Sequence, residues 1–220
     1  MAKRFAVIGL GRFGQKLAVS LEQRGGEVIA IDNDADCVDE VKDRVSVAVQ
    51  LDCTDKSALI AQGVNQVDVA IVCVGDSFET NVLSAMLLKE IGVKQVYSRA
   101  AMGVQTQVLE AIGVDQVIHP EEEVAEKLAN ILAFKPLIDY LHISPLVNVA
   151  QVEAPRAFWN KSISEIQVRK NYGVNVVLVR RSENPTNEEI PDPGTEIREG
   201  DILLVVGPAT NIERLVSLDK

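Results

Sequence analysis

A glycine-rich segment near the start of the chain is the part of the sequence best suited to bind a phosphate. Gly9 ends a short apolar run, residues 5–9, and Gly11 and Gly14 lie at the start of a segment with helical apolar spacing, residues 11–24. At such a strand-to-helix turn the second glycine permits close approach to phosphates, and the third lets the helix pack on the strand. Backbone N–H groups at the helix start would then face an anion. We expect this loop to bind a dinucleotide or an adenine nucleotide; the alternative is a purely structural turn.

Arg12 lies inside this glycine loop. A site for a hydride-transfer cofactor usually needs no cation there, whereas a guanidinium beside the loop could bind a terminal phosphate. The alternative interpretation is a solvated loop arginine.

An acidic segment follows the second expected strand. Asp32 ends that strand, and Asn33 and Asp34 come directly after it. A carboxylate at this position accepts hydrogen bonds from both hydroxyls of a ribose and disfavours a 2′-phosphate. We include all three residues in the expected nucleotide site.

The ends of the third, fourth and fifth expected strands also carry polar residues. Asp52 ends the third and Thr54 follows two positions later, where an adenine ring would lie. Asp52, Thr54 or Asp55 could also cap the helix that begins near residue 56, and the two roles do not exclude each other. Two further groups, Gly75 with Asp76 and then Arg99, end the next two strands. We expect Arg99 to contact an anion; a surface salt bridge is the alternative.

These residues require a parallel sheet whose strands all end at one edge. Apolar runs and helical spacing alternate through the first half of the chain, which predicts an α/β fold with a Rossmann-type doubly wound sheet. The expected strands are 5–9, 28–31, 46–49, 69–74, 95–98 and 116–118, and the helices are 11–24, 36–45, 56–62, 78–91 and 105–112.

The second half of the chain has a different pattern. Pro120 followed by three glutamates predicts a helix from there to about residue 135. Beyond it, alternating or apolar runs at 147–152, 174–179 and 202–206 and helical spacing at 162–169 and 211–218 predict a small α+β lobe, with an exposed loop over 183–200. We therefore expect a nucleotide-binding lobe over 1–120, a connecting helix over 121–138 and a C-terminal lobe over 139–220.

Composition excludes several classes of protein. A formal charge of −10 opposes binding to nucleic acid or to anionic lipid. No apolar run reaches the roughly 18 residues of a membrane span. Cys37, Cys53 and Cys73 lack the spacing of a metal site, which favours buried reduced thiols in a cytoplasmic protein.

Several segments together resemble the Ktr/Trk-type regulatory subunits of bacterial potassium transporters, the family of RCK domains. The resemblance covers nearly the whole chain and is carried by residues 7–14 (VIGLGRFG), 31–32 (ID), 51–52 (LD), 117–121 (VIHPE) and 199–203 (EGDIL).

This resemblance implies a cytoplasmic protein, peripheral to the inner face of the membrane, that gates potassium uptake through a membrane transporter subunit. It implies homodimers that assemble into an octameric ring, gated by ATP against ADP, with NAD or NADH able to occupy the same cleft. Arg12 would bind the γ-phosphate, Asp32 the ribose, and Asp52 and Cys53 the adenine region. Glu121 would face the dimer mate and help to hold Mg²⁺ or Ca²⁺, although it also suits an ordinary first helical turn. The other implied contacts are Phe13, Val74, Gly75, Asp76, Arg99, Ala100, Ala101 and Gln105.

Two departures from the family pattern affect nucleotide preference: Asp76 stands where a basic or small residue is frequent, and Cys53 replaces the usual alanine. In related subunits the C-terminal lobes bind cyclic di-AMP. The matching positions here are Arg169, Asn175, Ile190 and Pro191, residues that also suit a strand edge and a turn.

Three functions compete on this reading of the sequence. The first is a non-enzymatic regulator gated by nucleotide identity. The second is a small NAD-dependent oxidoreductase, which would need a proton donor, yet His119 and His142 lie in no recognisable catalytic arrangement. The third is a free-standing nucleotide sensor that acts on another partner.

Overall fold

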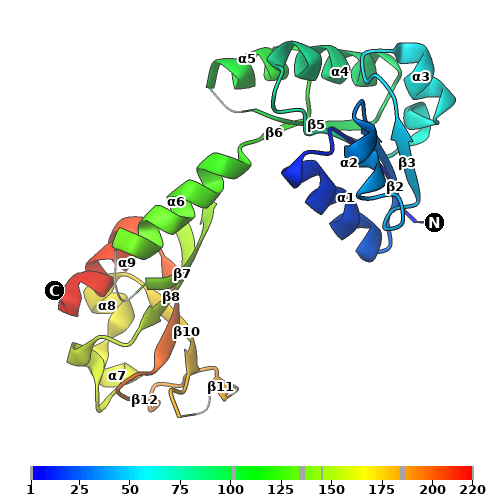
Figure 1. Cartoon of the computed structure of the whole chain (residues 1–220). Helices are drawn as coiled ribbons and strands as arrows, with labels where there is room; N and C mark the ends of the chain where they lie inside the picture. The colour runs from blue at the N-terminus through cyan, green and yellow to red at the C-terminus, as the bar shows by residue number, and fades with distance from the viewer. Residues whose placement is uncertain (1, 101–102, 134–136, 145, 184–186, 220) are drawn as a thin grey trace. The chain divides into compact units, whose positions relative to one another are not determined.

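Six parallel strands form the sheet of the N-terminal half, in the order β3-β2-β1-β4-β5-β6 (Figure 1). With its helical crossovers this order makes the Rossmann-type, doubly wound sheet that the sequence predicts. The strands are β1 Arg4–Ile8, β2 Glu27–Asp32, β3 Val47–Gln50, β4 Val69–Val72, β5 Gln95–Arg99 and β6 Gln116–Ile118. The helices are α1 Arg12–Gln23, α2 Ala35–Asp39, α3 Lys56–Ala61, α4 Phe78–Glu90 and α5 Gly103–Ala111.

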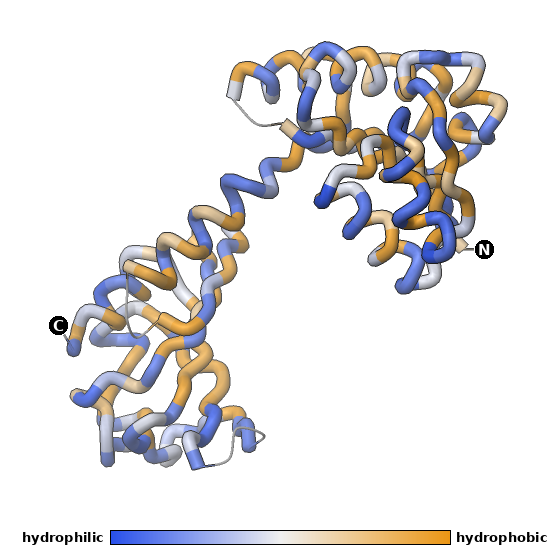
Figure 2. Tube along the Cα trace, viewed as in Figure 1, coloured by the Kyte–Doolittle hydropathy of each residue, from blue (hydrophilic) through white to orange (hydrophobic). Residues whose placement is uncertain are grey.

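The computed structural model describes residues 2–100, 103–133, 137–144, 146–183 and 187–219, and the chain divides into two units, Met1–Glu121 and Glu122–Lys220. In the first unit the sheet is buried on both faces. Ala6 and Ile8 of β1 join the cluster that contains Leu88 of α4, whereas Val7 joins the cluster that contains Ala18 of α1. Successive strand residues point to opposite faces, so both faces need apolar side chains. Figure 2 shows the resulting apolar runs along the strands.

One expected helix is much shorter than its spacing predicts. The sequence predicts a helix over 36–45, but α2 ends at Asp39 and turns follow it. Val38, Val41 and Val45 are nevertheless all buried, because the turns return them to the sheet. The spacing of the apolar residues therefore predicted correctly that these valines are buried, but it predicted the wrong backbone conformation after Asp39.

The C-terminal unit contains a five-stranded antiparallel sheet, β11-β10-β13-β8-β7, and a two-stranded sheet, β12-β9. Its strands are β7 Leu137–Ser144, β8 Val147–Glu153, β9 Lys161–Ser162, β10 Asn175–Arg180, β11 Glu188–Glu189, β12 Glu196–Ile197 and β13 Ile202–Gly207. Its helices are α6 Pro120–Ala133, which begins at the boundary between the units, α7 Ile163–Ile166, α8 Val168–Tyr172 and α9 Ala209–Val216. Apolar side chains of β8, β10 and β13 pack against α8 and α9 to form its core.

Several features of this unit differ from the expectations. Leu137 and Ile138 belong to strand β7, not to the connecting helix expected over 121–138. The end of the helix expected at residue 135 lies outside the described residues. The segment 162–169 is not one helix, because Gln167 adopts a left-handed conformation (φ 50°) between α7 and α8. Among the described residues, no helix is long and apolar enough to cross a bilayer.

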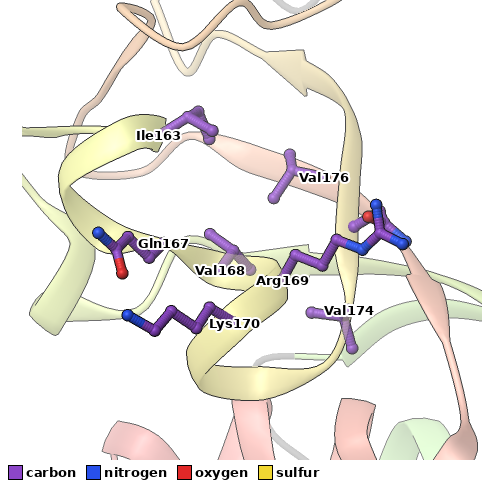
Figure 3. Close-up of a pocket in the computed structure, with 8 residues that line it drawn as sticks. Ile163, Gln167, Val168, Arg169, Lys170, Val174 and Val176 are labelled. Atoms are coloured by element: carbon purple, nitrogen blue, oxygen red, sulfur yellow. The ribbon is translucent and has the colours of Figure 1, made fainter.

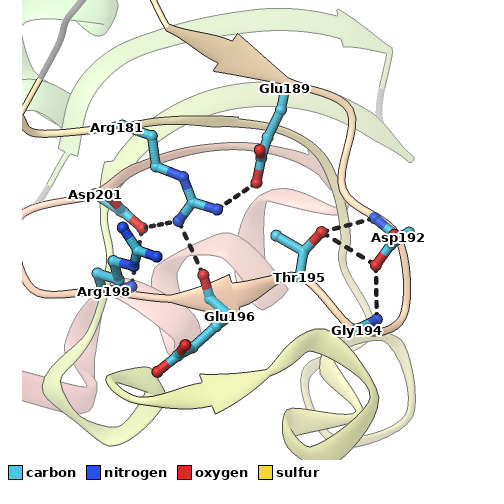
Figure 4. A network of polar contacts seen from close by, with 8 residues as sticks. All are labelled: Arg181, Glu189, Asp192, Gly194, Thr195, Glu196, Arg198 and Asp201. Atoms are coloured by element: carbon cyan, nitrogen blue, oxygen red, sulfur yellow. Dashed lines mark hydrogen bonds and ion pairs between the residues drawn. The ribbon is translucent and has the colours of Figure 1, made fainter.

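The segment 183–200, expected to be an exposed loop, contributes two short strands and part of a polar network (Figure 4). Arg181 donates to Asp201 Oδ2 at 2.7 Å and forms an ion pair with Glu189. The backbone N–H of Arg198 donates to the same oxygen of Asp201 at 2.9 Å. Asp201 is buried, as is Ile197 of β12, so this segment is anchored at two points.

The buried ion pair yields a prediction about stability. Asp201→Ala leaves Arg181 without its buried counter-ion and should lower the free energy of unfolding of the C-terminal unit by about 3 kcal/mol. Lys127→Ala breaks the exposed pair with Asp139 in the same unit and should cost less than about 1 kcal/mol. Trp159, the only tryptophan, packs against this core, so its fluorescence in a denaturant titration measures both values. Equal costs would show that burial does not control the strength of the Arg181–Asp201 pair.

Candidate functional site

A cleft of about 570 Å³ lies at the carboxyl edge of the parallel sheet in the N-terminal unit. It opens beside the point where the strand order reverses, between β1 and β4, which is where open α/β sheets bind ligands. Its lining residues are Ile8, Gly9, Gly11, Arg12, Ile31, Asp32, Asn33, Asp52, Cys53, Thr54, Cys73, Val74, Gly75, Asp76, Ser77, Thr80 and Arg99.

The glycine loop forms one wall of this cleft. Gly9 has a φ of +90°, and a β-carbon there would approach the backbone N of Val74 to 2.8 Å. A β-carbon on Gly14 would overlap the carbonyl oxygen of Gly9, so α1 packs on β1 only without a side chain there. Gly11, by contrast, faces open space and is the N-cap of α1, with no side-chain cap. The first N–H groups of α1 are therefore available to an anion in the cleft.

Arg12 begins α1 and lines the cleft with an exposed side chain. The first turn of α1 contains no acidic residue. The guanidinium and the positive end of the helix dipole therefore favour an anion in the same place.

Asp32 lines the cleft beside the glycine loop. The backbone N–H of Leu10 donates to Asp32 Oδ2 at 2.5 Å, and that of Asp34 donates to Oδ1 at 2.9 Å. The carboxylate is thereby held against the glycine loop, with lone pairs left for further donors such as ribose hydroxyls. Asp34 itself does not line the cleft and instead caps α2, where it accepts from the N–H of Asp36.

Three polar residues after β3, Asp52, Thr54 and Asp55, were candidates for the cap of α3. Asp55 caps α3, accepting from the N–H groups of Ser57 and Ala58. Asp52 accepts from both the N–H and the hydroxyl of Thr54, and these bonds lower the pKa of Asp52. Asp52 and Thr54 thus remain in the cleft and do not cap the helix.

Two thiols also line the cleft. Burial raises the pKa of Cys53, and burial raises that of Cys73 to about 12. Both side chains are neutral thiols at pH 7, so they act as small apolar walls and not as nucleophiles.

Arg99 links the cleft to the start of α6. Its guanidinium lies over Gly75, where a β-carbon would approach Nη1 to 2.7 Å. The same guanidinium donates to Glu121 at 2.5 Å from Nη2 and 3.4 Å from Nε. Of the two sequence alternatives for Arg99, the salt bridge is present in the structure. The anion contact stays a prediction, for which Arg99 is placed in the lining of the cleft.

The pairing of Glu121 bears on the expected cation site. The described residues contain no group of three or more histidine, cysteine, aspartate or glutamate side chains placed to hold a metal ion. Glu121 fits a cation only if other ligands, such as nucleotide phosphates or a second chain, complete the coordination.

The remaining expected site residues lie beside the cleft or away from it. Phe13 packs into the core under α1, and Gly14 lies in the contact between α1 and β1. Ala100 is buried, and its carbonyl lies 3.0 Å from His119 Nδ1. Gln105 lies on α5 and does not line the cleft, and Ala101 lies outside the described residues.

Sequence reasoning missed five lining residues: Ile8, Ile31, Cys73, Ser77 and Thr80. Ser77 had a detectable signal, because it precedes an expected helix and caps α4 by accepting from the N–H of Thr80. Ile8, Ile31 and Thr80 are ordinary strand or helix residues, and Cys73 directly follows β4, so the position of all four in the cleft depends on the tertiary fold.

A second pocket, of about 470 Å³, lies in the C-terminal unit between α7, α8 and β10 (Figure 3). Arg169 and Asn175, singled out in the sequence, both line it, whereas Ile190 and Pro191 do not. Lys170 adds a second cation. The remaining lining residues are Ile163, Gln167, Val168, Val174 and Val176.

Neither histidine lines the cleft. His119 is held between the Ala100 carbonyl and the hydroxyl of Thr106, and His142 lies 2.7 Å from Asn148 Oδ1 in the C-terminal unit. The described cleft therefore offers no imidazole to a bound ligand.

Comparison with known proteins supports one family over the whole chain. The TrkA-N domain matches residues 5–120, and the TrkA-C domain matches residues 150–219. The Ktr system potassium uptake protein C of Bacillus subtilis is 36% identical over 97% of this chain and 96% of its own length. The Ktr system potassium uptake protein A of the same organism is 31% identical over 96% and 95%, respectively.

Solved structures agree in fold. The GsuK RCK domain superimposes with a TM-score of 0.65 at 18% identity, over 99% of this chain and 48% of that one. The GsuK channel bound to NAD gives a TM-score of 0.55 at 23% identity, over 97% of this chain and 38% of the channel chain. This chain thus spans about half or less of each of these solved chains. From its two matched domains and its full-length relatives, the chain belongs to the Ktr/Trk family of RCK-domain regulatory subunits of potassium uptake systems.

Proposed function

We propose that this protein is a non-enzymatic, cytosolic regulatory subunit that binds ATP or ADP and gates potassium uptake through a membrane transporter subunit. The observation that carries the proposal is the position of Arg12, a cation at the uncapped start of α1, within a cleft that also holds Asp32. This arrangement suits a ligand that has phosphates at one end and a ribose at the other. NAD or NADH shares both groups and fits the same cleft.

The charge of the cleft favours a divalent cation with the nucleotide. Asp32, Asp52 and Asp76 line it together with Arg12 and Arg99, so its carboxylates outnumber its guanidinium groups. Terminal phosphates would add further negative charge next to Asp76. Mg²⁺ or Ca²⁺ would offset that repulsion, and Glu121 from this chain and its dimer mate would supply protein oxygens.

Nucleotide identity would act through the contact between Arg99 and Glu121. A terminal phosphate competes with Glu121 for the guanidinium of Arg99, and a cation competes with Arg99 for the carboxylate. ATP and ADP differ in both effects, so they can favour different arrangements of the first turn of α6. Such differential affinity is what a ligand needs in order to shift a conformational equilibrium.

The assembly we propose is a homodimer that builds an octameric ring beneath the transporter. Val124, Leu128 and Leu132 recur at helical spacing on α6 and are 65%, 52% and 75% exposed. An apolar stripe of this kind is costly in water and indicates a protein interface. A second copy of the chain is the occupant that the dimer-mate role of Glu121 requires.

The pocket between α7, α8 and β10 supports a second ligand, cyclic di-AMP. Arg169 and Lys170 provide two cations for its two phosphates, and four aliphatic side chains provide apolar walls for its bases. Ile190 and Pro191 are left out of this site, because they do not line the pocket.

The two other functions account for fewer of these features. An oxidoreductase needs a proton donor beside the nicotinamide, and neither histidine lines the cleft. A free-standing sensor would use the same nucleotide contacts, but it does not explain why the chain matches a potassium uptake protein over nearly its full length. A screen for cofactor oxidation with alcohols and hydroxy acids, if it found turnover, would favour the enzyme.

The phosphate role of Arg12 is tested by Arg12→Ala. We expect the Kd for ATP to rise by about tenfold or more, the effect of losing a charge-assisted hydrogen bond, while the Kd for ADP rises much less. Lys16→Ala removes the same charge one turn later on α1, outside the cleft, and should change neither value. Calorimetric titration of each variant measures both constants. Equal losses for ATP and ADP would contradict a terminal-phosphate contact.

The α6 interface is tested by Leu128→Asp. A charge in the apolar stripe should dissociate the assembly, so light scattering during size-exclusion chromatography should show a shift from oligomer to monomer, with and without ATP, ADP and Mg²⁺. Glu126→Gln also changes the charge by one, about 200° around the helix, and should leave the mass unchanged. A wild-type protein that is monomeric under every nucleotide condition would argue against the whole regulatory assembly.

The second ligand site is tested by Arg169→Ala. We expect cyclic di-AMP binding to weaken by at least about tenfold, because the guanidinium would bind a phosphate in a partly apolar pocket. Arg214→Ala on α9 removes the same charge outside the pocket and serves as the matched control. Calorimetry on the full chain measures both. No detectable binding of cyclic di-AMP to the wild type would remove this part of the proposal.

A further inference from the structure

Helix α4 buries an amide side chain behind the nucleotide cleft. Asn81 is 2% exposed, and it does not line the cleft. Burying a primary amide costs free energy unless its donors and its acceptor are hydrogen-bonded, so the Asn81 amide requires hydrogen-bond partners.

Those partners are the backbone at the ends of two neighbouring strands. Asn81 Nδ2 donates to the carbonyl of Val74 at 3.0 Å and to the carbonyl of Arg99 at 2.9 Å. The hydroxyl of Ser98 donates to Asn81 Oδ1 at 2.6 Å. Since carbonyl oxygens can only accept, these contacts fix the orientation of the amide, and both of its N–H donors are used.

The two carbonyls lie beyond the end of the strand pairing. The register of β4 with β5 ends at Val72 and Ser98, after which the strands are no longer paired with each other. Val74 and Arg99 both line the cleft. The amide of Asn81 therefore replaces the missing ladder at the point where the two chain segments separate to form the cleft wall.

The side chain of Arg99 depends on the same separation. Its guanidinium lies over Gly75, the residue after Val74, with no room for a β-carbon between them. A small change in the distance between the two carbonyls would move the guanidinium relative to this loop. The buried amide of Asn81 thus holds the two segments that carry Gly75 and the guanidinium of Arg99.

We propose that Asn81 is a positioning residue of the nucleotide site, which fixes the loop at Gly75 and the guanidinium of Arg99 for phosphate binding without contacting the ligand. The role rests on the proposed function, because it concerns the affinity of that cleft for nucleotide. A purely structural asparagine would stabilise the unit without any specific coupling to Arg99.

The experiment is a double-mutant cycle on ADP binding, measured by calorimetry well below the unfolding temperature of each full-length variant. We expect Asn81→Ala to raise the Kd for ADP by about tenfold, the order expected for two lost hydrogen bonds. In the background of Arg99→Ala, the same substitution should add less than about threefold, because no guanidinium is left to position. Asn171→Ala removes an amide-to-carbonyl bond in the other unit and should leave the Kd unchanged.

A second variant and a second measurement protect the test against loss of folding. Ser98→Ala removes only the hydroxyl that orients the amide and should give a smaller loss of the same kind. Hydrogen exchange of the ligand-free protein should speed up at residues 73–77 in both variants. Two results would overturn the proposal. One is a Kd for ADP that rises in the double variant by the full product of the two single effects, and the other is a Kd for Asn81→Ala within about twofold of the wild type. A wild type that binds no adenine nucleotide would overturn the proposed function itself, and this role with it.

Discussion

The close contact between the start of α1 and the end of β1 is the constraint on which the cleft of the N-terminal unit depends. Because Gly14 has no side chain, the helix lies against the carbonyl of Gly9. Because Gly9 takes a left-handed conformation and has no β-carbon, its backbone lies close to that of Val74, just beyond the end of β4. The helix therefore begins at the sheet edge, between β1 and β4. For this reason its free N–H groups and the side chain of Arg12 lie at the cleft.

Hydrogen bonds from backbone N–H groups and from polar side chains hold the charged residues of the cleft in place. The N–H of Leu10 holds the carboxylate of Asp32, and the hydroxyl and N–H of Thr54 hold Asp52. Asn81 holds the carbonyl of Arg99. Preorganised contacts of this kind reduce the ordering that a ligand would otherwise have to bring about, so affinity and discrimination depend on residues that need not touch it. The two neutral thiols complete the wall without adding charge.

The sequence was sufficient for the parts of this arrangement that follow from local spacing. The strand-helix alternation predicted the doubly wound sheet, and since parallel strands end at one edge, Asp32, Asp52, Gly75 and Arg99 were expected together. Asn81 could not be recognised, because a polar residue in an amphipathic helix usually faces water and its burial depends on how α4 meets two strand ends. Strand β7 lacks a strict alternation of apolar residues and therefore gave no clear strand signal.

The pairing of Arg99 with Glu121 was equally hidden, since it joins the end of β5 to the first turn of a helix that begins after β6. The same helix, α6, thus contains in its first turn a residue that pairs with a cleft-lining arginine, and farther along it has an exposed apolar stripe at Val124, Leu128 and Leu132. Under the proposed function, a change at the terminal phosphates need not travel through the sheet in order to reach the assembly surface. It would have only to exchange the partner of one guanidinium at the first turn of α6, the helix that also carries the stripe.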